Sequence, residues 1–137
     1  MIMLESCKNV KADFAKMWCI LDTGVKCSTE LNNNTSRVQE LALPGLNLRG
    51  ALSPSLGNLT SLETLNLSNN SLHGSIPDDL ASLQNLTFLD LSSNNFSGTI
   101  PAALGDANLS LVHFNVSNNS SFQISDYHIR IVKMDAN

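Results

Sequence analysis

Residues 62–72, with the sequence LETLNLSNNSL, decide the fold of this 137-residue chain. They follow the pattern L-x-x-L-x-L-x-x-N-x-L. In its central L-x-L, side chains of a short strand alternate with a period of two residues, so Leu65 and Leu67 point to one side and Asn66 to the other. One such strand cannot bury its leucines alone. The pattern therefore predicts a strand that packs against further copies of the same unit.

The unit recurs at an interval of 24 residues, as Leu43, Leu67 and Leu91 show. Other positions that keep this interval are Leu41, Leu65 and Leu89; Leu48, Leu72 and Phe96; Gly50, Gly74 and Gly98; Leu52, Ile76 and Ile100; and Leu56, Leu80 and Leu104. A fourth copy begins with Leu111, Phe114 and Val116, displaced by one inserted residue, and then loses the pattern. Stacked units of this kind form a solenoid, in which each inward Leu contributes on the order of 2 kcal/mol.

An asparagine column accompanies the leucines. Asn70, Asn94 and Asn119 stand where each strand must turn, and the first copy has Leu46 at this position. An Asn amide both donates hydrogen bonds to turn backbone groups and accepts them, so a stacked column satisfies polar atoms that the bend would leave unpaired. The column is interpreted as a structural ladder.

The second half of the unit is more specific. Residues 72–77 (LHGSIP) and 96–101 (FSGTIP) fit L-x-G-x-I-P, with Phe96 in place of the first Leu. Gly suits a tight bend or a close backbone approach, and Pro interrupts hydrogen-bonded pairing. Over residues 38–122 this sequence pattern resembles the leucine-rich repeats of plant receptor-like kinases and receptor-like proteins. Residues 43–50 and 54–62 look like the first repeat of such ectodomains.

The resemblance implies an α/β leucine-rich-repeat solenoid of three to four repeats, with short parallel strands on the concave face and an N-terminal helical cap. We expect the cap at 1–37, the repeats at 38–122 and a non-repeat tail at 123–137. A helix in the cap agrees with apolar residues at steps of three or four. These residues are Leu4, Cys7, Val10, Phe14, Met17 and Leu21. The chain is interpreted as a fragment or a short gene product.

The resemblance also suggests an exported protein. Residues 22–27 (DTGVKC) resemble the end of the family's cysteine-bearing cap, which implies a Cys19–Cys27 disulfide. Three cysteines would leave Cys7 unpaired or linked to another chain, and the alternative is three free thiols. Candidate N-x-S/T glycan acceptors are Asn33, Asn58, Asn85, Asn95 and Asn108. The expected location is extracellular or at the plasma membrane, although residues 1–21 show no secretory signal.

Composition and motifs exclude several classes of function. Eight Lys plus Arg against 12 Asp plus Glu give a net charge of −4, which argues against a nucleic-acid partner. No apolar run is long enough to span a membrane. No phosphate-binding, nucleophile-elbow, metalloprotease or protein-kinase motif occurs, so we expect no catalysis, no cofactor and no metal site.

The function expected is therefore binding, through the outward residues of the strands. Their first column contains Glu40, Thr64, Phe88 and His113. The second contains Ala42, Asn66, Asp90 and Asn115, and the third Pro44, Ser68, Ser92 and Ser117. An aromatic residue flanked by polar groups is typical of an interface hot spot, whereas a single exposed apolar residue is ordinary. We predict partner binding at Glu40, Thr64, Phe88, Asp90 and His113.

The sequence thus predicts a non-catalytic module that binds a protein or peptide ligand, with a receptor kinase among the candidate partners. Two alternatives stay open. One is a secreted inhibitor similar to the polygalacturonase-inhibiting proteins, and the other is an interaction scaffold that is not exported.

Overall fold

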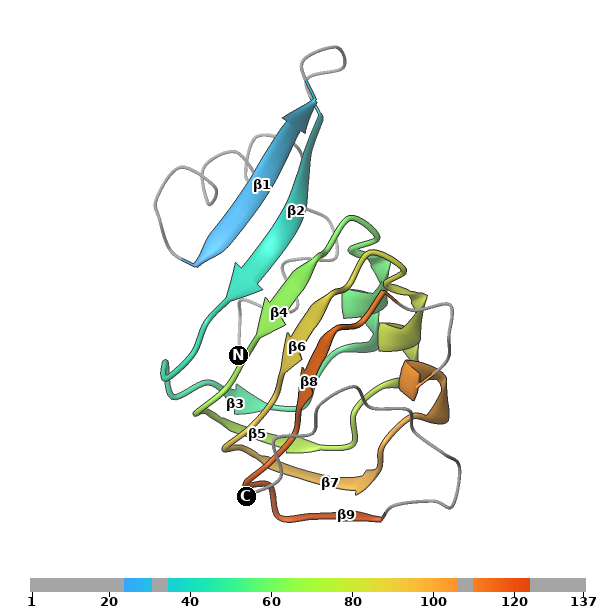
Figure 1. Ribbon diagram of the computed structural model, residues 1–137. Coiled ribbons are helices and arrows are strands. Elements are labelled where there is room, and N and C mark those ends of the chain that lie inside the picture. The colour runs from blue at the N-terminus through green and yellow to red at the C-terminus, as the bar shows by residue number, and fades with distance from the viewer. Residues whose placement is uncertain (1–23, 31–34, 106–109, 124–137) are drawn as a thin grey trace.

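The computed structural model describes residues 24–30, 35–105 and 110–123 (Figure 1). The predicted cap helix, Cys19, Asn33, Asn108 and nearly all of the expected tail lie outside these residues. The strands are β1 (Val25–Glu30), β2 (Thr35–Ala42), β3 (Arg49–Gly50), β4 (Thr64–Asn66), β5 (Ser71–Gly74), β6 (Phe88–Asp90), β7 (Asn95–Thr99), β8 (His113–Asn115) and β9 (Ser121–Gln123). The 3-10 helices are η2 (Pro54–Asn58), η3 (Asp78–Ser82) and η4 (Ala102–Gly105).

Each coil of the chain has three sides (Figure 1). On one side, the strands form a five-stranded sheet in the order β1-β2-β4-β6-β8. On a second side, they form a four-stranded sheet in the order β3-β5-β7-β9. The 3-10 helices occupy the third side. The predicted solenoid of parallel strands is therefore confirmed, and the strands from β2 to β8 pair in parallel.

The sheet register equals the interval of the repeat. Leu41 pairs with Leu65, Leu65 with Leu89, and Leu89 with Phe114. An equivalent hydrogen bond joins each pair of coils just after the strands, for example from the Leu67 N–H to the Asp90 carbonyl at 2.9 Å. Residues at equivalent positions of the repeat therefore stack into columns that run across the sheet.

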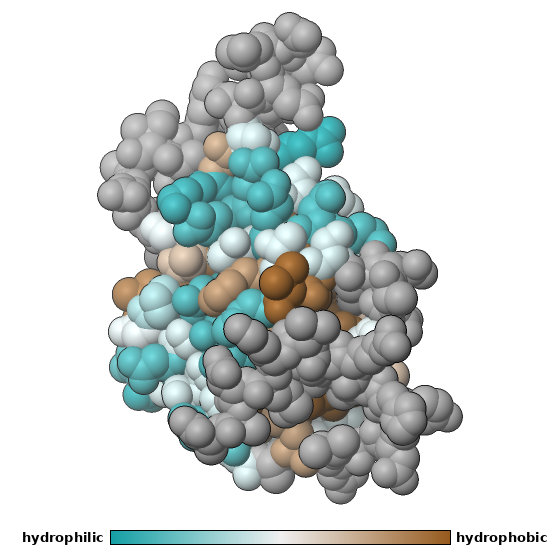
Figure 2. Space-filling view, viewed as in Figure 1, coloured by the Kyte–Doolittle hydropathy of each residue, from teal (hydrophilic) through white to brown (hydrophobic). Residues whose placement is uncertain are grey.

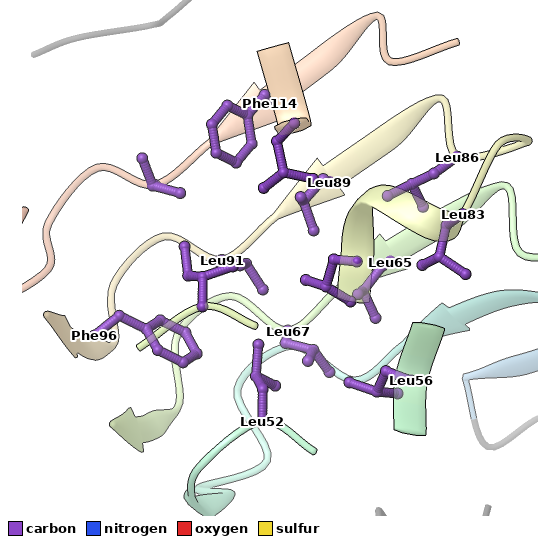
Figure 3. Close-up of a cluster of buried hydrophobic side chains, with 14 of the residues drawn as sticks. Leu52, Leu56, Leu65, Leu67, Leu83, Leu86, Leu89, Leu91, Phe96 and Phe114 are labelled. Atoms are coloured by element: carbon purple, nitrogen blue, oxygen red, sulfur yellow. The ribbon is translucent and has the colours of Figure 1, made fainter. Parts of the chain in front are cut away.

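The core is the space that the three sides enclose. Leu65, Leu67, Leu89 and Leu91 come from the five-stranded side and are fully buried (Figure 3). Leu83 and Leu86, which follow the 3-10 helix η3, meet them from the opposite side. The aliphatic and aromatic positions of the 24-residue interval thus lie in or against one continuous apolar core, as the sequence predicts.

Two turns in each coil depend on residues that tolerate a positive φ. Gly74 and Gly98 adopt φ of 85° and 89°, and a Cβ at Gly74 would meet nothing closer than 3.6 Å. Backbone conformation, rather than space, therefore selects glycine here. The other turn is a column of left-handed residues, Gly45, Asn69, Ser93 and Asn118. Asn and Gly tolerate this conformation well, so Ser93 is the exception.

One feature of the N-terminal end was not predicted. β1 pairs antiparallel with β2 and extends the five-stranded sheet beyond the first repeat. Residues 25–30, which the sequence places in the cap, therefore form a strand. In the described residues the third side of each coil is 3-10 and not α-helical. Within the same residues, no helix has the length and apolar character needed to cross a bilayer.

Candidate functional site

The outward residues of β2, β4, β6 and β8 form what we call the sheet face. Glu40, Thr64, Phe88 and His113 are consecutive partners in the register, so they form one column across four strands. The next column contains Ala42, Asn66, Asp90 and Asn115. The structure therefore brings together the five residues predicted for partner binding.

Residues of the second column also stabilise the turns that follow their strands. Asp90 Oδ1 accepts hydrogen bonds from the Ser92 N–H at 2.9 Å and from Ser92 Oγ at 2.6 Å. Asn66 makes the same two bonds to Ser68, and Asn115 accepts the bond from the Ser117 N–H. One oxygen of each side chain thus holds the turn after its strand. Asp90 has only its second carboxylate oxygen left for a partner.

Phe88 and His113 form a stacked pair. Their ring centroids lie 4.2 Å apart and the ring planes differ by 9°. This is the face-to-face arrangement that two planar side chains adopt when they stand on neighbouring strands about 4.8 Å apart. Within the described residues, His113 Nε2 is the one buried side-chain polar atom without a hydrogen-bond partner.

The sequence analysis missed a second group of residues on this side of the molecule. Gln39, Glu63, Thr87 and Val112 each stand one position before the first outward column. Val112, next to His113, has 67% of its surface exposed. Glu63 is exposed, and its Oε1 accepts a hydrogen bond from Gln39 Nε2 at 3.3 Å. The signal was present, because L-x-x-L places two residues outside the core before each strand.

Charges gather at the N-terminal end of the sheet face. Lys26 Nζ on β1 forms an ion pair with Glu40 Oε2 on β2 at 2.8 Å. Figure 2 shows hydrophilic residues toward the β1–β2 end and hydrophobic residues in the middle of the same view. The sheet face therefore changes from charged to aromatic between β2 and β8.

The asparagine ladder lies at the turn after the strands. Asn94 Nδ2 donates to the Leu67 carbonyl at 2.9 Å and to the Leu91 carbonyl at 3.2 Å, and Asn94 Oδ1 accepts from the Leu72 N–H at 3.0 Å. Asn70 and Asn119 make corresponding bonds in their own coils. At the first coil, Leu46 is 55% exposed and its N–H donates to Asn70 Oδ1.

The described cysteine and glycan acceptors differ in their surroundings. Cys27 is disulfide-bonded, while the expected partner Cys19 lies outside the described residues. Asn58 is exposed and makes no side-chain hydrogen bond in the described part of the chain. Asn85 Nδ2 donates to the Thr60 carbonyl at 2.9 Å, and Asn95 Oδ1 accepts from Ser120 Oγ. All three are exposed, and Asn58 is the one whose side chain makes no hydrogen bond in the described residues.

The described residues contain no group of three or more His, Cys, Asp or Glu side chains that could hold a metal ion. The chemistry that the sheet face offers is stacking on two aromatic rings, hydrogen bonding and carboxylate charge. These are means of recognition.

Comparisons with known proteins agree with the fold. A family model for leucine-rich repeats, in two copies, matches residues 60–105. The leucine-rich-repeat ectodomain of the receptor kinase SOBIR1 from Arabidopsis thaliana is 34% identical, with a TM-score of 0.66 over 74% of this chain and 56% of that one. The BIR2 ectodomain from Arabidopsis thaliana is 31% identical, with a TM-score of 0.57 over 85% of this chain and 68% of that one.

A larger structure holds partners as well. The Arabidopsis receptor kinase HAESA, in complex with the peptide hormone IDA and the co-receptor SERK1, is 37% identical with a TM-score of 0.52 over 61% of this chain. The present chain spans 56% of the SOBIR1 ectodomain and 14% of the HAESA chain. A comparison with curated proteins gave no match.

Repeats of 24 to 25 residues, parallel pairing and an asparagine ladder define a leucine-rich-repeat solenoid. The chain belongs to the leucine-rich-repeat family, in the form found in the ectodomains of plant receptor kinases.

Proposed function

We propose that this chain is a non-catalytic module that binds a protein or peptide through its sheet face. The observation that carries the proposal is the stacked pair of Phe88 and His113. The strands already hold the two aromatic rings in place. A partner that covers them therefore has a smaller entropic cost of ordering side chains than it would have on mobile ones. The exposed Val112 beside them enlarges the apolar surface.

The partner class follows from the surface and from the relatives. A net charge of −4 and the carboxylates of Glu40, Glu63 and Asp90 disfavour a polyanion. HAESA is described in complex with a peptide hormone and a co-receptor kinase. A peptide, or the ectodomain of a receptor kinase, is accordingly the proposed ligand of this chain.

The proposed location is extracellular or at the plasma membrane. The disulfide at Cys27 supports an oxidising compartment, because cytosolic thiols are kept reduced. The exposed amide of Asn58 in an N-x-T sequence supports passage through the glycosylation machinery. Mass spectrometry of the native protein tests this location, and a glycan-free Asn58 with reduced Cys27 would contradict it.

The test of binding is a selection of random peptides displayed on phage against the full chain, followed by affinity measurements with variants. Phe88→Ala is expected to weaken binding of the selected peptides by about 1–2 kcal/mol, or roughly five- to thirtyfold in Kd. Leu46→Ala is the matched control, because Leu46 is an exposed apolar residue outside the sheet face. Equal loss in both variants, or no loss in either, would contradict the proposal.

A further inference from the structure

The side chains of the first outward column differ in length. Along it stand a carboxylate (Glu40), a short hydroxyl (Thr64), a phenyl ring (Phe88) and an imidazole ring (His113). Thr64 has the shortest side chain of the four. Because neighbouring strands are about 4.8 Å apart, a short residue between two long ones leaves a space about one planar group thick.

One face of Phe88 borders this space. The other face is occupied, because the His113 ring stacks on it at 4.2 Å. β6 lies between β4 and β8 in the sheet, so the free face of Phe88 is turned toward Thr64 on β4. In the described part of the chain, Phe88 has no second ring contact.

Two carboxylates stand next to Thr64, one in the sequence and one in the sheet register. Glu63 directly precedes Thr64 and is exposed, and the one hydrogen-bond partner of its carboxylate in the described residues is the neutral Gln39 amide. Glu40 stands across Thr64 from Phe88, with Oε2 paired to Lys26. The Glu63 carboxylate therefore forms no ion pair within the described residues.

The geometry points to an arginine side chain of the partner as the occupant of the space over Thr64. This inference rests on the proposed function and names the chemistry that the sheet face selects. A guanidinium is planar and always charged, stacks on an aromatic ring, and pairs with a carboxylate through two parallel N–H groups. Phe88 supplies the ring, and Glu63 supplies the carboxylate. A lysine has the charge without the plane, so it fits less well.

The peptide selection described above also tests this inference. Peptides that bind the full chain are expected to contain Arg. Replacing that Arg by citrulline, which keeps the plane and removes the charge, should weaken binding about tenfold, and replacing it by Lys about threefold. Glu63→Gln and Thr64→Gln should each weaken binding of the Arg peptide by about threefold to tenfold, the first by removing the charge and the second by filling the space.

Asp78→Asn is the matched control for charge, because it removes one exposed carboxylate from η3, away from the sheet face. It should leave the affinity unchanged. Selected peptides that depend on Phe88 but lack Arg, or bind equally well to Glu63→Gln and Thr64→Gln, would overturn the arginine inference and leave the proposed function intact. Failure of Phe88→Ala to weaken any selected peptide would overturn both.

Discussion

Replacing Asn94 by Ala removes the central member of the asparagine ladder. Asn94 connects its own coil to the preceding one, because it accepts from the Leu72 N–H and donates to the carbonyls of Leu67 and Leu91. Each carbonyl has a second donor. Asn70 Nδ2 lies 2.9 Å from the Leu67 oxygen, and Asn119 Nδ2 lies 3.1 Å from the Leu91 oxygen.

The cost of Asn94→Ala can be worked from this pattern. The Leu72 N–H loses its acceptor in a fully buried residue, which costs about 1–3 kcal/mol. The bonds to the two shared carbonyls and to the Ser92 carbonyl are weakened rather than left unpaired, and together they contribute about 1 kcal/mol. We therefore expect Asn94→Ala to lower the free energy of unfolding by about 3 kcal/mol.

Urea unfolding followed by circular dichroism measures this change. Asn58→Ala is the control, because the exposed Asn58 makes no side-chain hydrogen bond in the described residues, and it should stay within about 0.5 kcal/mol of the parent chain. Asn94→Asp keeps an acceptor for the Leu72 N–H but sets a carboxylate oxygen against the two carbonyls, so its loss should be at least as large. An Asn94→Ala variant as stable as Asn58→Ala would refute the structural interpretation of the ladder.

Three further predictions concern stability and can be measured by the same unfolding experiment. Leu89→Ala should cost about 3–5 kcal/mol, because Leu89 is fully buried in the shared core; a loss below about 1 kcal/mol would contradict that burial. Gly57→Ala should cost about 1–3 kcal/mol, since the new Cβ would lie 2.4 Å from the Asp79 backbone oxygen of the next coil. Ser93→Asn should raise the free energy of unfolding by about 0.5–1 kcal/mol because φ at Ser93 is 52°, and a destabilised variant would show that the Ser side chain has another role.

The repeat interval explains why most of the fold could be predicted from the sequence. An interval of 24 residues, with one residue inserted before the fourth copy, fixes which side chains share a column, so Thr64, Phe88 and His113 could be placed together from the sequence. The interval also separates inward leucines from outward residues. It says nothing about segments outside the repeat, and β1 was missed because an antiparallel strand before the first coil has no counterpart in the pattern.

Some details of the sheet face could not be predicted from the sequence, for other physical reasons. The stacking of Phe88 on His113 depends on side-chain rotamers, which a column assignment does not specify. Asp90 was predicted to bind a partner, and the hydrogen bonds of its Oδ1 to Ser92, which hold the turn, could not be foreseen from the column assignment. Glu63 was not predicted, because the L-x-L pattern assigns outward residues from the first strand position onward and Glu63 precedes it.

The central claim is that a partner covers the sheet face, and hydroxyl-radical footprinting of the full chain tests it most directly. Phe88 and His113 both carry rings that hydroxyl radicals modify. Binding of a selected peptide should lower the modification of these two residues and of Val112, while Leu46 and Leu59 keep their rates. Unchanged modification of Phe88 and His113 at saturating peptide, with protection elsewhere on the chain, would contradict the account.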